Sequence, residues 1–600
     1  MDGSTPTLLV SLAAAEMMGA PGGGRAHLVT MAQTHDGHVF RPASDSKFGG
    51  GRRDMDAFDV VVLGGGTAGL HVATEAAGGG KSVALVEAGL IGGESPYLAC
   101  LPSNSLLLSA TRGETWEDAV ARRNEVTGGL DDSGPARRVA DAGVTVIRGT
   151  GRITGPGQVE VTLAQGEETV PLTYSDLVIA TGCEPVAPPI EGLSDIPAWT
   201  TAESLCSRDL PRRLIVLGGG PAGCELTQIY AAFGSQVTLV EAEHALLPGE
   251  PAFAGEILAA ALRRAGAEIY LGSPAGKAER TPDGLTLALE DGTRIDADRL
   301  LIATGRRPRL SGLGLDALGI TVTPGMALPT TTTCRVADAS DERYGSEGLD
   351  GARGSHGPGR VWAAGDVTGV TQTHASLYQA QVVVANILGQ QREADYSAIP
   401  RCVFTTPSVF AVGIVPETAQ AANAEDGEAP EESAAGRMLR TARAELGDTA
   451  RAYLAQDDLG CLELYADAQT GVLAGAVAVG PDAATWMGEI TLAIRAKIPV
   501  TVLADVVHAF PTYGEAIQTA LRELAGAPGT AGTADKQGRG FGSVSELDLE
   551  TPEDDAIEQR QEVVTDENAD GIRREVPFEV NEADAVEQEL AVGFDDDDYR

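Results

Sequence analysis

Two copies of one glycine fingerprint, Gly-x-Gly-x-x-Gly, limit the folds open to this chain more than any other feature of its 600 residues. The copies occupy residues 64–69 and 218–223, and each lies between two apolar runs. Glu87 and Glu241 close the second run of each copy, 23 positions after the first glycine (64 to 87 and 218 to 241). The repeated spacing predicts two strand–turn–helix units of the Rossmann type.

Each predicted unit has the parts that a dinucleotide site requires. The glycine turn leaves the first amides of the helix bare, so that they can hold a pyrophosphate, and the acidic residue can take ribose hydroxyls. Three more apolar runs end in turn residues, at 177–182, 300–305 and 361–367. These are either further edges of the cofactor sites or ordinary strand exits, and we favour the first interpretation. The sequence therefore predicts two bound dinucleotides.

The composition excludes several classes of partner. A net charge of −42 argues against nucleic acid and anionic membranes, because phosphate contacts need clustered Lys and Arg. Apolar runs are too short for a membrane span, and residues 8–15 lack the basic flank of a signal peptide, so we expect a cytoplasmic protein. The seven scattered cysteines predict neither a structural metal site nor a disulfide framework.

The order of these parts resembles the class I pyridine nucleotide-disulfide oxidoreductases, the group of dihydrolipoamide dehydrogenase, glutathione reductase and mercuric reductase. The resemblance covers residues 56–524. It implies an α/β fold with two Rossmann-like domains, for FAD and NAD(P), and a C-terminal α+β dimerisation domain, hence a homodimer. The residues implied for FAD are Gly64, Gly66, Gly69, Glu87, Thr181, Gly182 and Asp366. Those implied for the nicotinamide cofactor are Gly218, Gly220, Gly223 and Glu241.

Six segments follow from motif and composition. They are a flexible N-terminal extension (1–54), the first part of the FAD domain (55–205), the NAD(P) domain (206–330), the second part of the FAD domain (331–398), the interface domain (399–526) and an acidic disordered tail (527–600). In the interface domain we expect antiparallel strands at 462–465 and 472–480, and helices at 487–496 and 513–524.

Glu241 bears on which nicotinamide cofactor binds. Its charge would repel a 2′-phosphate, and no Lys or Arg stands between Ala242 and Glu250 to accept one, so NADH is favoured over NADPH. The alternative is that Glu241 is only a solvated acid at a strand end. Pro221 occupies the position where the family has an aromatic gate over the nicotinamide site, which predicts a pocket open to solvent.

The chain departs from the family at its redox-active disulfide. The family has Cys-x-x-x-x-Cys, and this chain has Ser95 at the first position and Cys100 at the second. Thiol exchange needs two sulfurs within reach, so no dithiol can cycle here. The family's His-Pro-Thr signature, followed by Glu515, begins with Phe510, which cannot transfer a proton, and His508 is interpreted as a bystander.

A third departure lies beside the flavin. The family has a lysine that pairs with a glutamate at the position of Glu225, and this chain has Asn104 instead. A carboxylate left without that cation favours a raised pKa or a hydrogen bond from the Asn104 amide.

The remaining chemistry is hydride transfer from NADH to FAD. The leading hypothesis is an FAD-dependent NAD(P)H oxidoreductase that passes electrons to a small-molecule acceptor, a quinone, dye or oxygen. Ser95, Cys100 and Phe510 would line a cavity for that planar acceptor. The alternatives are a soluble pyridine nucleotide transhydrogenase, and a degenerate flavoprotein that serves as a binding or regulatory partner.

Overall fold

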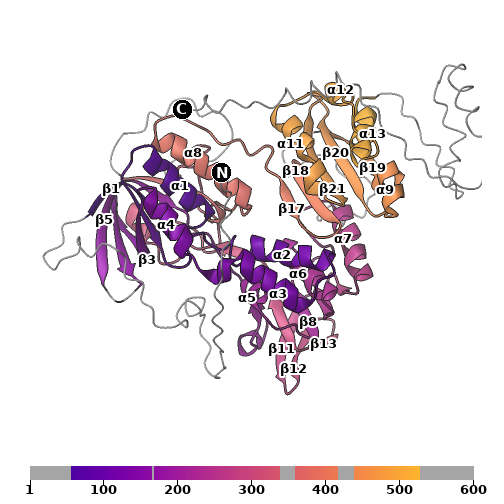
Figure 1. Ribbon diagram of the computed structural model, residues 1–600, viewed down its shortest axis with the longest axis horizontal. Helices are drawn as coiled ribbons and strands as arrows, with labels where there is room; N and C mark the ends of the chain where they lie inside the picture. The colour runs from indigo at the N-terminus through magenta and orange to yellow at the C-terminus, as the bar shows by residue number, and fades with distance from the viewer. Residues whose placement is uncertain (1–55, 165, 167, 338–358, 417–437, 527–600) are drawn as a thin grey trace, which may run out of the picture. The chain divides into compact units, whose positions relative to one another are not determined.

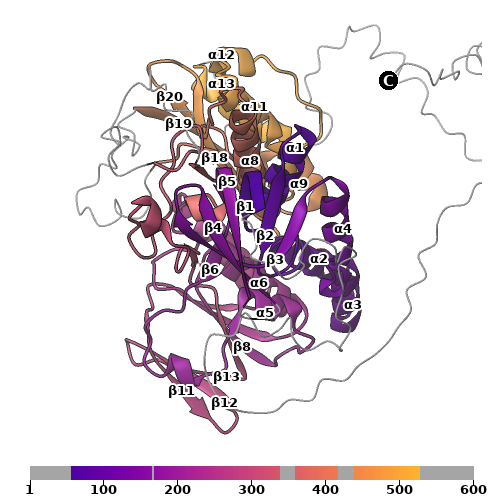
Figure 2. The ribbon, with the colours of Figure 1, turned by 90° about the vertical axis from the view of Figure 1, so that its left-hand side faces the viewer.

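The computed structural model describes residues 56–164, 166, 168–337, 359–416 and 438–526 (Figure 1 and Figure 2). The extension predicted at 1–54 and the acidic tail predicted at 527–600 lie outside these residues. The described part contains three sheet-based modules, and the first two each include one glycine fingerprint.

The first module is built on a six-stranded sheet. Its strands are β1 (Asp56–Leu63), β2 (Val83–Glu87), β3 (Thr145–Gly155), β4 (Gln158–Leu163), β5 (Thr169–Ile179) and β16 (Arg360–Ala363). Its helices are α1 (Thr67–Gly78), α4 (Ser133–Asp141) and α8 (Thr373–Ile387). Helices α2 (Cys100–Thr111) and α3 (Trp116–Val126) follow β2 in the chain but pack into the core of the second module. The strands β3, β2, β1, β5 and β16 run parallel. Strand β4 pairs antiparallel with the second half of β3 and the first half of β5.

Helices α1 and α8 lie side by side against one face of this sheet (Figure 1). Strand β1 has four fully buried residues in succession, as expected for a parallel strand covered on both faces. Val60 and Val62 pack toward α1 and α8, and Val61 and Leu63 pack toward the opposite face. The carboxyl end of β1 is therefore held rigidly where the first glycine turn begins.

The second module repeats this plan. Its parallel sheet has the order β10 (Glu268–Tyr270), β9 (Gln236–Val240), β8 (Arg213–Leu217), β14 (Arg299–Ile302) and β7 (Trp199–Thr200). The other elements are α5 (Thr201–Cys206), α6 (Pro221–Ala232), α7 (Ala252–Arg264), the antiparallel sheet of β11 (Ala275–Thr281), β12 (Gly284–Leu289) and β13 (Arg294–Ala297), and the ribbon of β6 (Cys183–Pro185) with β15 (Arg306–Pro308). Strand β7 pairs with β14 at the edge of this sheet, so the sheet includes residues that precede 206, where the predicted NAD(P) domain begins.

The third module is a five-stranded antiparallel sheet with helices. Its strands have the order β17 (Arg401–Val403), β18 (Ser408–Gly413), β21 (Leu473–Gly480), β20 (Cys461–Asp467) and β19 (Leu439–Glu445). Its helices are α9 (Ala450–Ala455), α10 (Ala483–Trp486), α11 (Gly488–Arg495), α12 (Val500–Leu503) and α13 (Gly514–Leu524). The predicted antiparallel strand pair and the two predicted helices are confirmed by β20, β21, α11 and α13.

Both faces of this sheet are covered, which explains why β21 is buried along its whole length. Side chains of β21 alternate between two cores, as the period of a strand requires. Ala476 and Ala478 pack with the helices α11 and α13, and Val477 and Val479 pack with α7 of the second module. The third module is thus joined to the second through apolar contacts as well as polar ones.

Candidate functional site

The first glycine turn connects β1 to α1 in a conformation that only glycine fits. Gly64 has a φ of +105°, and a Cβ on it would lie 2.2 Å from the carbonyl oxygen of Ala180. A Cβ on Gly69 would lie 1.8 Å from the carbonyl oxygen of Gly64. Gly66 precedes α1 without any side-chain cap, so the first helical amides are bare. This arrangement fits a pyrophosphate on the helix N-terminus.

The second turn has the same geometry. Gly218 has a φ of +111°, and a Cβ on Gly223 would lie 1.9 Å from the carbonyl oxygen of Gly218. Gly220 precedes α6 without a side-chain cap, and a Cβ on it would meet no atom within 4 Å. The space in front of α6 is therefore free for a ligand, and this turn also fits a dinucleotide.

The two predicted ribose acids lie directly beside these turns. Glu87 accepts hydrogen bonds from the amides of Gly65 and Gly89, and Glu241 accepts them from Gly219 and Glu243. Both side chains are half-buried. Each carboxylate is thus held at the end of its strand by backbone amides, at the position that the fingerprint predicts for contact with ribose hydroxyls.

The other residues predicted for FAD gather where β5 and β16 end. The hydroxyl of Thr181 donates to the Arg309 carbonyl over 2.8 Å, and Gly182 adopts a φ of +70°. Burial raises the pKa of the nearby Asp366 carboxyl to about 6, against the opposing effect of the Arg306 guanidinium. Glu94, which the sequence did not single out, forms ion pairs with Arg306 and Arg309 in the same region. No sequence pattern links these distant residues, so only the fold brings them together.

Ser95 and Cys100 meet at a third hydroxyl. The Ser95 Oγ lies 3.3 Å from the Thr373 Oγ1, and the Cys100 Sγ lies 3.4 Å from the same atom. Thr373 is the first residue of α8, so these side chains cluster at the N-terminus of that helix. All seven cysteines are free thiols. The cluster contains one sulfur and two hydroxyls.

Of the two expectations for Glu225, a raised pKa or a hydrogen bond from the Asn104 amide, the structure contradicts the second. The Asn104 Nδ2 donates to the Cys100 carbonyl over 2.9 Å, within α2, and not to Glu225. Glu225 accepts instead from the Ser103 hydroxyl over 2.7 Å and from the Phe404 amide over 3.0 Å. An amide side chain on a helix readily donates to the backbone carbonyl one turn earlier, so the Asn104 amide is not available to Glu225. Burial raises the pKa of Glu225, as expected, although both hydrogen bonds lower it.

Phe510 does not reach the Ser95 and Cys100 cluster within one chain. Its side chain is 75% exposed on the third module. His508 is turned away, with its Nε2 lying 2.8 Å from Glu489 Oε1. Glu515 Oε2 accepts from the Ala450 amide over 3.4 Å, and its Oε1 has no hydrogen-bond partner among the described residues. The expected cavity lined by Ser95, Cys100 and Phe510 is therefore not formed by a single described chain.

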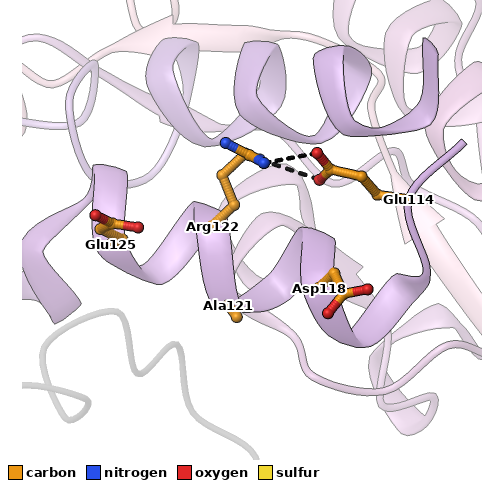
Figure 3. A pocket seen from close by; sticks show the side chains of 5 residues that line it. All are labelled: Glu114, Asp118, Ala121, Arg122 and Glu125. Carbon is orange, nitrogen blue, oxygen red and sulfur yellow. Dashed lines mark hydrogen bonds and ion pairs between the residues drawn. The ribbon is translucent and has the colours of Figure 1, made fainter. Parts of the chain in front are cut away.

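A surface concavity of about 450 Å³ lies elsewhere, on α3 (Figure 3). Its lining includes Arg122, which is paired with Glu114, while Asp118 and Glu125 point away from that pair. None of the residues that hold the glycine turns contributes to it. This acidic concavity is not part of the candidate cofactor site. Over the described ranges, no cluster of His, Cys, Asp or Glu is arranged to hold a metal.

Comparison with protein families assigns most of the chain. A family model for pyridine nucleotide-disulphide oxidoreductases matches residues 58–342, and a model for the dimerisation domain of the same group matches residues 399–521. A third model, the Mycobacterium Rv3202A family, matches residues 540–600 at the C-terminus. Among the described helices, none is long and apolar enough to cross a membrane.

Individual relatives agree with this assignment. The chain is 31% identical to a dihydrolipoyl dehydrogenase of Thermus scotoductus over 78% of its own length and 98% of the relative. It is 28% identical to a mercuric reductase of Acidithiobacillus ferrooxidans over 81% of its length and 85% of the relative.

Solved structures show the same fold. The Cu(II) complex of RclA from Escherichia coli, titled an HOCl-induced flavoprotein disulfide reductase, has a TM-score of 0.65 at 26% identity, covering 78% of this chain and 99% of that one. LpdA from Mycobacterium tuberculosis has a TM-score of 0.65 at 25% identity, covering 78% of this chain and all of the other.

Proposed function

Because the chain belongs to the class I pyridine nucleotide-disulfide oxidoreductases, we propose that it oxidises NADH through FAD and delivers the electrons to a diffusible acceptor rather than to a disulfide. The family makes it an FAD-dependent pyridine nucleotide oxidoreductase with a dimerisation domain. The proposal adds the identity of the nicotinamide cofactor and the absence of a sulfur relay.

The chain's own residues would hold the two cofactors. The α1 turn, with Glu87, Thr181, Gly182 and Asp366, would bind FAD, and the α6 turn with Glu241 would bind NADH. Bound FAD supplies the group that accepts a hydride from the reduced nicotinamide. Glu241 supports NADH over NADPH, because its carboxylate would lie where a 2′-phosphate would have to fit.

Hydride transfer requires orientation but no acid or base from the protein. The chain orients the reactants by fixing the two helix N-termini with buried parallel strands, and by packing α2 on α6 between them. At the N-terminus of α8, the bare amides and the helix dipole would stabilise negative charge that develops nearby. The two glycine turns and the helix N-terminus that this half-reaction would use are therefore present.

The observation that carries the proposal is the Ser95, Thr373 and Cys100 cluster. A relay would need a second sulfur at position 95, where this chain has a serine, and the hydroxyl 3.4 Å from the Cys100 Sγ is that of Thr373. Phe510 replaces the imidazole that would exchange protons with a thiol, and its ring is exposed on the surface. Electrons that enter from NADH thus have no dithiol through which to leave.

Anaerobic titration of the purified holoprotein with NADH tests this proposal. We expect the flavin absorbance to bleach in one step, without the long-wavelength band that a thiolate next to oxidised flavin produces. Turnover should then follow with quinones or dyes, and neither lipoamide nor glutathione disulfide should be reduced.

Two results would contradict the proposal in different ways. Failure of NADH to bleach the flavin would remove the hydride half-reaction and support a binding or regulatory role. Rapid reduction of a thio-NAD analogue by NADPH, with no turnover of quinones, would indicate a transhydrogenase instead.

A further inference from the structure

The chain passes from the first module to the second twice. The first passage runs from β2 to α2 through residues 88–99, because α2 packs into the core of the second module. The second passage is the two-stranded ribbon, in which β6 carries the chain out and β15 carries it back. Just after β15, Leu310 and Leu313 pack in the core of the first module. A movement of one module against the other must therefore bend these connections.

The ribbon connects the two glycine turns over short spans of chain. A Cβ on Gly64 of the first turn would lie 2.2 Å from the Ala180 carbonyl oxygen, and β6 begins three residues after Ala180 (180 to 183). A Cβ on Gly218 of the second turn would lie 2.5 Å from the Ala303 carbonyl oxygen, and β15 begins three residues after Ala303 (303 to 306). Bending of the ribbon therefore changes the placement of one turn relative to the other.

Residues 92–94 lie on the first glycine turn. Gly93 adopts a φ of +71°, and a Cβ on it would lie 2.6 Å from the Cα of Gly66. Glu94 is the next residue, and it is the only charged residue in the sequence of segment 91–99. Its backbone is thus held by the turn that would bind FAD, and its side chain is the group of this segment that can form an ion pair.

The Glu94 carboxylate binds two arginines of the ribbon. Its Oε2 accepts from the Arg306 Nη2, and its Oε1 accepts from the Arg309 Nη2 over 3.3 Å. The side chains of Glu94 and Arg306 are each 29% exposed, so the ion pair is partly shielded from solvent. The Arg306 Nη2 also donates to the Cys183 carbonyl over 2.9 Å. One guanidinium therefore links Glu94 to both strands of the ribbon.

Glu94 contacts both ends of the returning strand. Arg306 is the first residue of β15, and Arg309 directly follows its last residue. At the end next to the first module, the Arg309 amide donates to the Gly182 carbonyl over 2.9 Å. A bend of β15 between these two arginines must break one of the two bonds to Glu94. The carboxylate thus acts as a brace across the strand.

A second ion pair on the ribbon has no such reach. The Arg307 Nε donates to the Glu184 Oε1 over 2.7 Å, and these residues face each other on β15 and β6. The Glu184 side chain is 32% exposed, which is close to the 29% of Glu94. This pair matches the first in charge type and in the exposure of its carboxylate, but it stays within the ribbon. It provides a matched control.

We propose that Glu94 is a positioning residue for hydride transfer, which braces the ribbon through Arg306 and Arg309 and thereby holds the two glycine turns in the relative placement that the reaction requires. The inference rests on the proposed function, because it needs FAD and NADH to bind at these turns. Reaction between two bound groups depends steeply on their placement, and a displacement of about 1 Å can cost about a hundredfold in rate. Glu94 should therefore act on the rate of the reaction and not on the binding of NADH.

Rapid mixing of the FAD-loaded protein with NADH under anaerobic conditions measures this rate. In Glu94→Gln, which keeps the size of the side chain and removes its charge, the limiting rate of flavin reduction should fall by about tenfold or more. The Kd of NADH and the FAD content should not change. Arg306→Gln should cause the same loss, and the double variant should lose no more than either single variant, because both remove one contact. Glu184→Gln should leave the rate unchanged.

Hydrogen exchange tests the brace without any reaction. In the FAD-loaded protein, peptides that cover residues 91–99 and 303–309 should exchange faster in Glu94→Gln than in the unaltered protein. The segment and the ribbon would open separately once the bond between them is lost. Glu184→Gln should leave the exchange of residues 91–99 unchanged.

Each result supports or overturns the proposal. An unchanged limiting rate or unchanged exchange in Glu94→Gln would overturn it, and so would an equal loss of rate in Glu184→Gln. Loss of FAD from Glu94→Gln, with a normal rate after reloading, would assign Glu94 to the first turn alone and also overturn it. Should Glu94→Gln fail to fold, Arg309→Gln removes only one of the two bonds and decides by the same measurements. If NADH does not reduce the flavin of the unaltered protein, the proposed function fails, and the exchange data alone decide whether the brace exists.

Discussion

At the scale of single residues, a neighbouring hydroxyl takes over a role that the sequence suggested for an amide. Ser103 donates to Glu225, whereas Asn104 bonds the carbonyl of Cys100 within its own helix. The two residues are adjacent, but they point to different faces of α2, because successive residues on a helix are about 100° apart. The bond to Glu225 therefore fixes how α2 sits on α6.

Substitution of Ser103 by Ala should measure that bond. Ser103→Ala would leave an oxygen of the Glu225 carboxyl without its donor, so it should lower the free energy of unfolding by about 1–3 kcal/mol. Ser105 provides a matched control, since it is a buried serine of the same helix whose hydroxyl has no partner among the described residues. Ser105→Ala should change the stability by less than about 0.5 kcal/mol. Urea denaturation compares the two, and equal losses would contradict the role of Ser103.

At the scale of secondary-structure elements, the two strand–turn–helix units show what the sequence could predict and what it could not. Their glycines and terminal acids obey local rules of backbone geometry, so the spacing sufficed to place Glu87 and Glu241 beside the turns. The pairing of Glu94 with Arg306 joins residues far apart in the chain, and Thr373 meets Cys100 only through the packing of α8. Such contacts have no periodic signature, so they could not be read from one sequence.

Two glycines of the second turn should separate folding from binding. Gly223→Ala places a methyl group 1.9 Å from the Gly218 carbonyl oxygen, so we expect a loss of stability of about 1–3 kcal/mol or more. Gly220→Ala meets no protein atom within 4 Å, so the fold should persist while NADH binds more weakly. Thermal unfolding and NADH titration, each with FAD bound, measure the two effects. If Gly220→Ala binds NADH as tightly as the unaltered protein, the nucleotide does not rest on this turn.

At the scale of the whole molecule, the third module leaves a short apolar segment uncovered. Val502, Val506, Val507 and Phe510 are exposed, and Val507 is 90% exposed. Exposed apolar groups that gather in this way mark an interaction surface. The module matches the dimerisation domain of the family, so we expect this segment to lie in the contact between two copies of the chain.

A charge on this segment should separate the copies. Val507→Asp would bury an unpaired carboxylate in the proposed contact, so the protein should shift from dimer to monomer at micromolar concentration. Met326→Asp is the control, because Met326 is also largely exposed (61%) but lies outside the third module. Light scattering after gel filtration gives the mass of each variant. A Val507→Asp protein that remains dimeric would place the contact elsewhere.

The cluster around Cys100 contains a single sulfur, which bears on the reagents that could block the proposed activity. Trivalent arsenicals disable enzymes by bridging two neighbouring thiolates, and soft metal ions gain much of their affinity from the same pair of ligands. With hydroxyls of Ser95 and Thr373 around it, Cys100 offers such reagents a single point of attachment. If the protein oxidises NADH as proposed, we expect arsenite to inhibit that activity less than it inhibits a dithiol reductase.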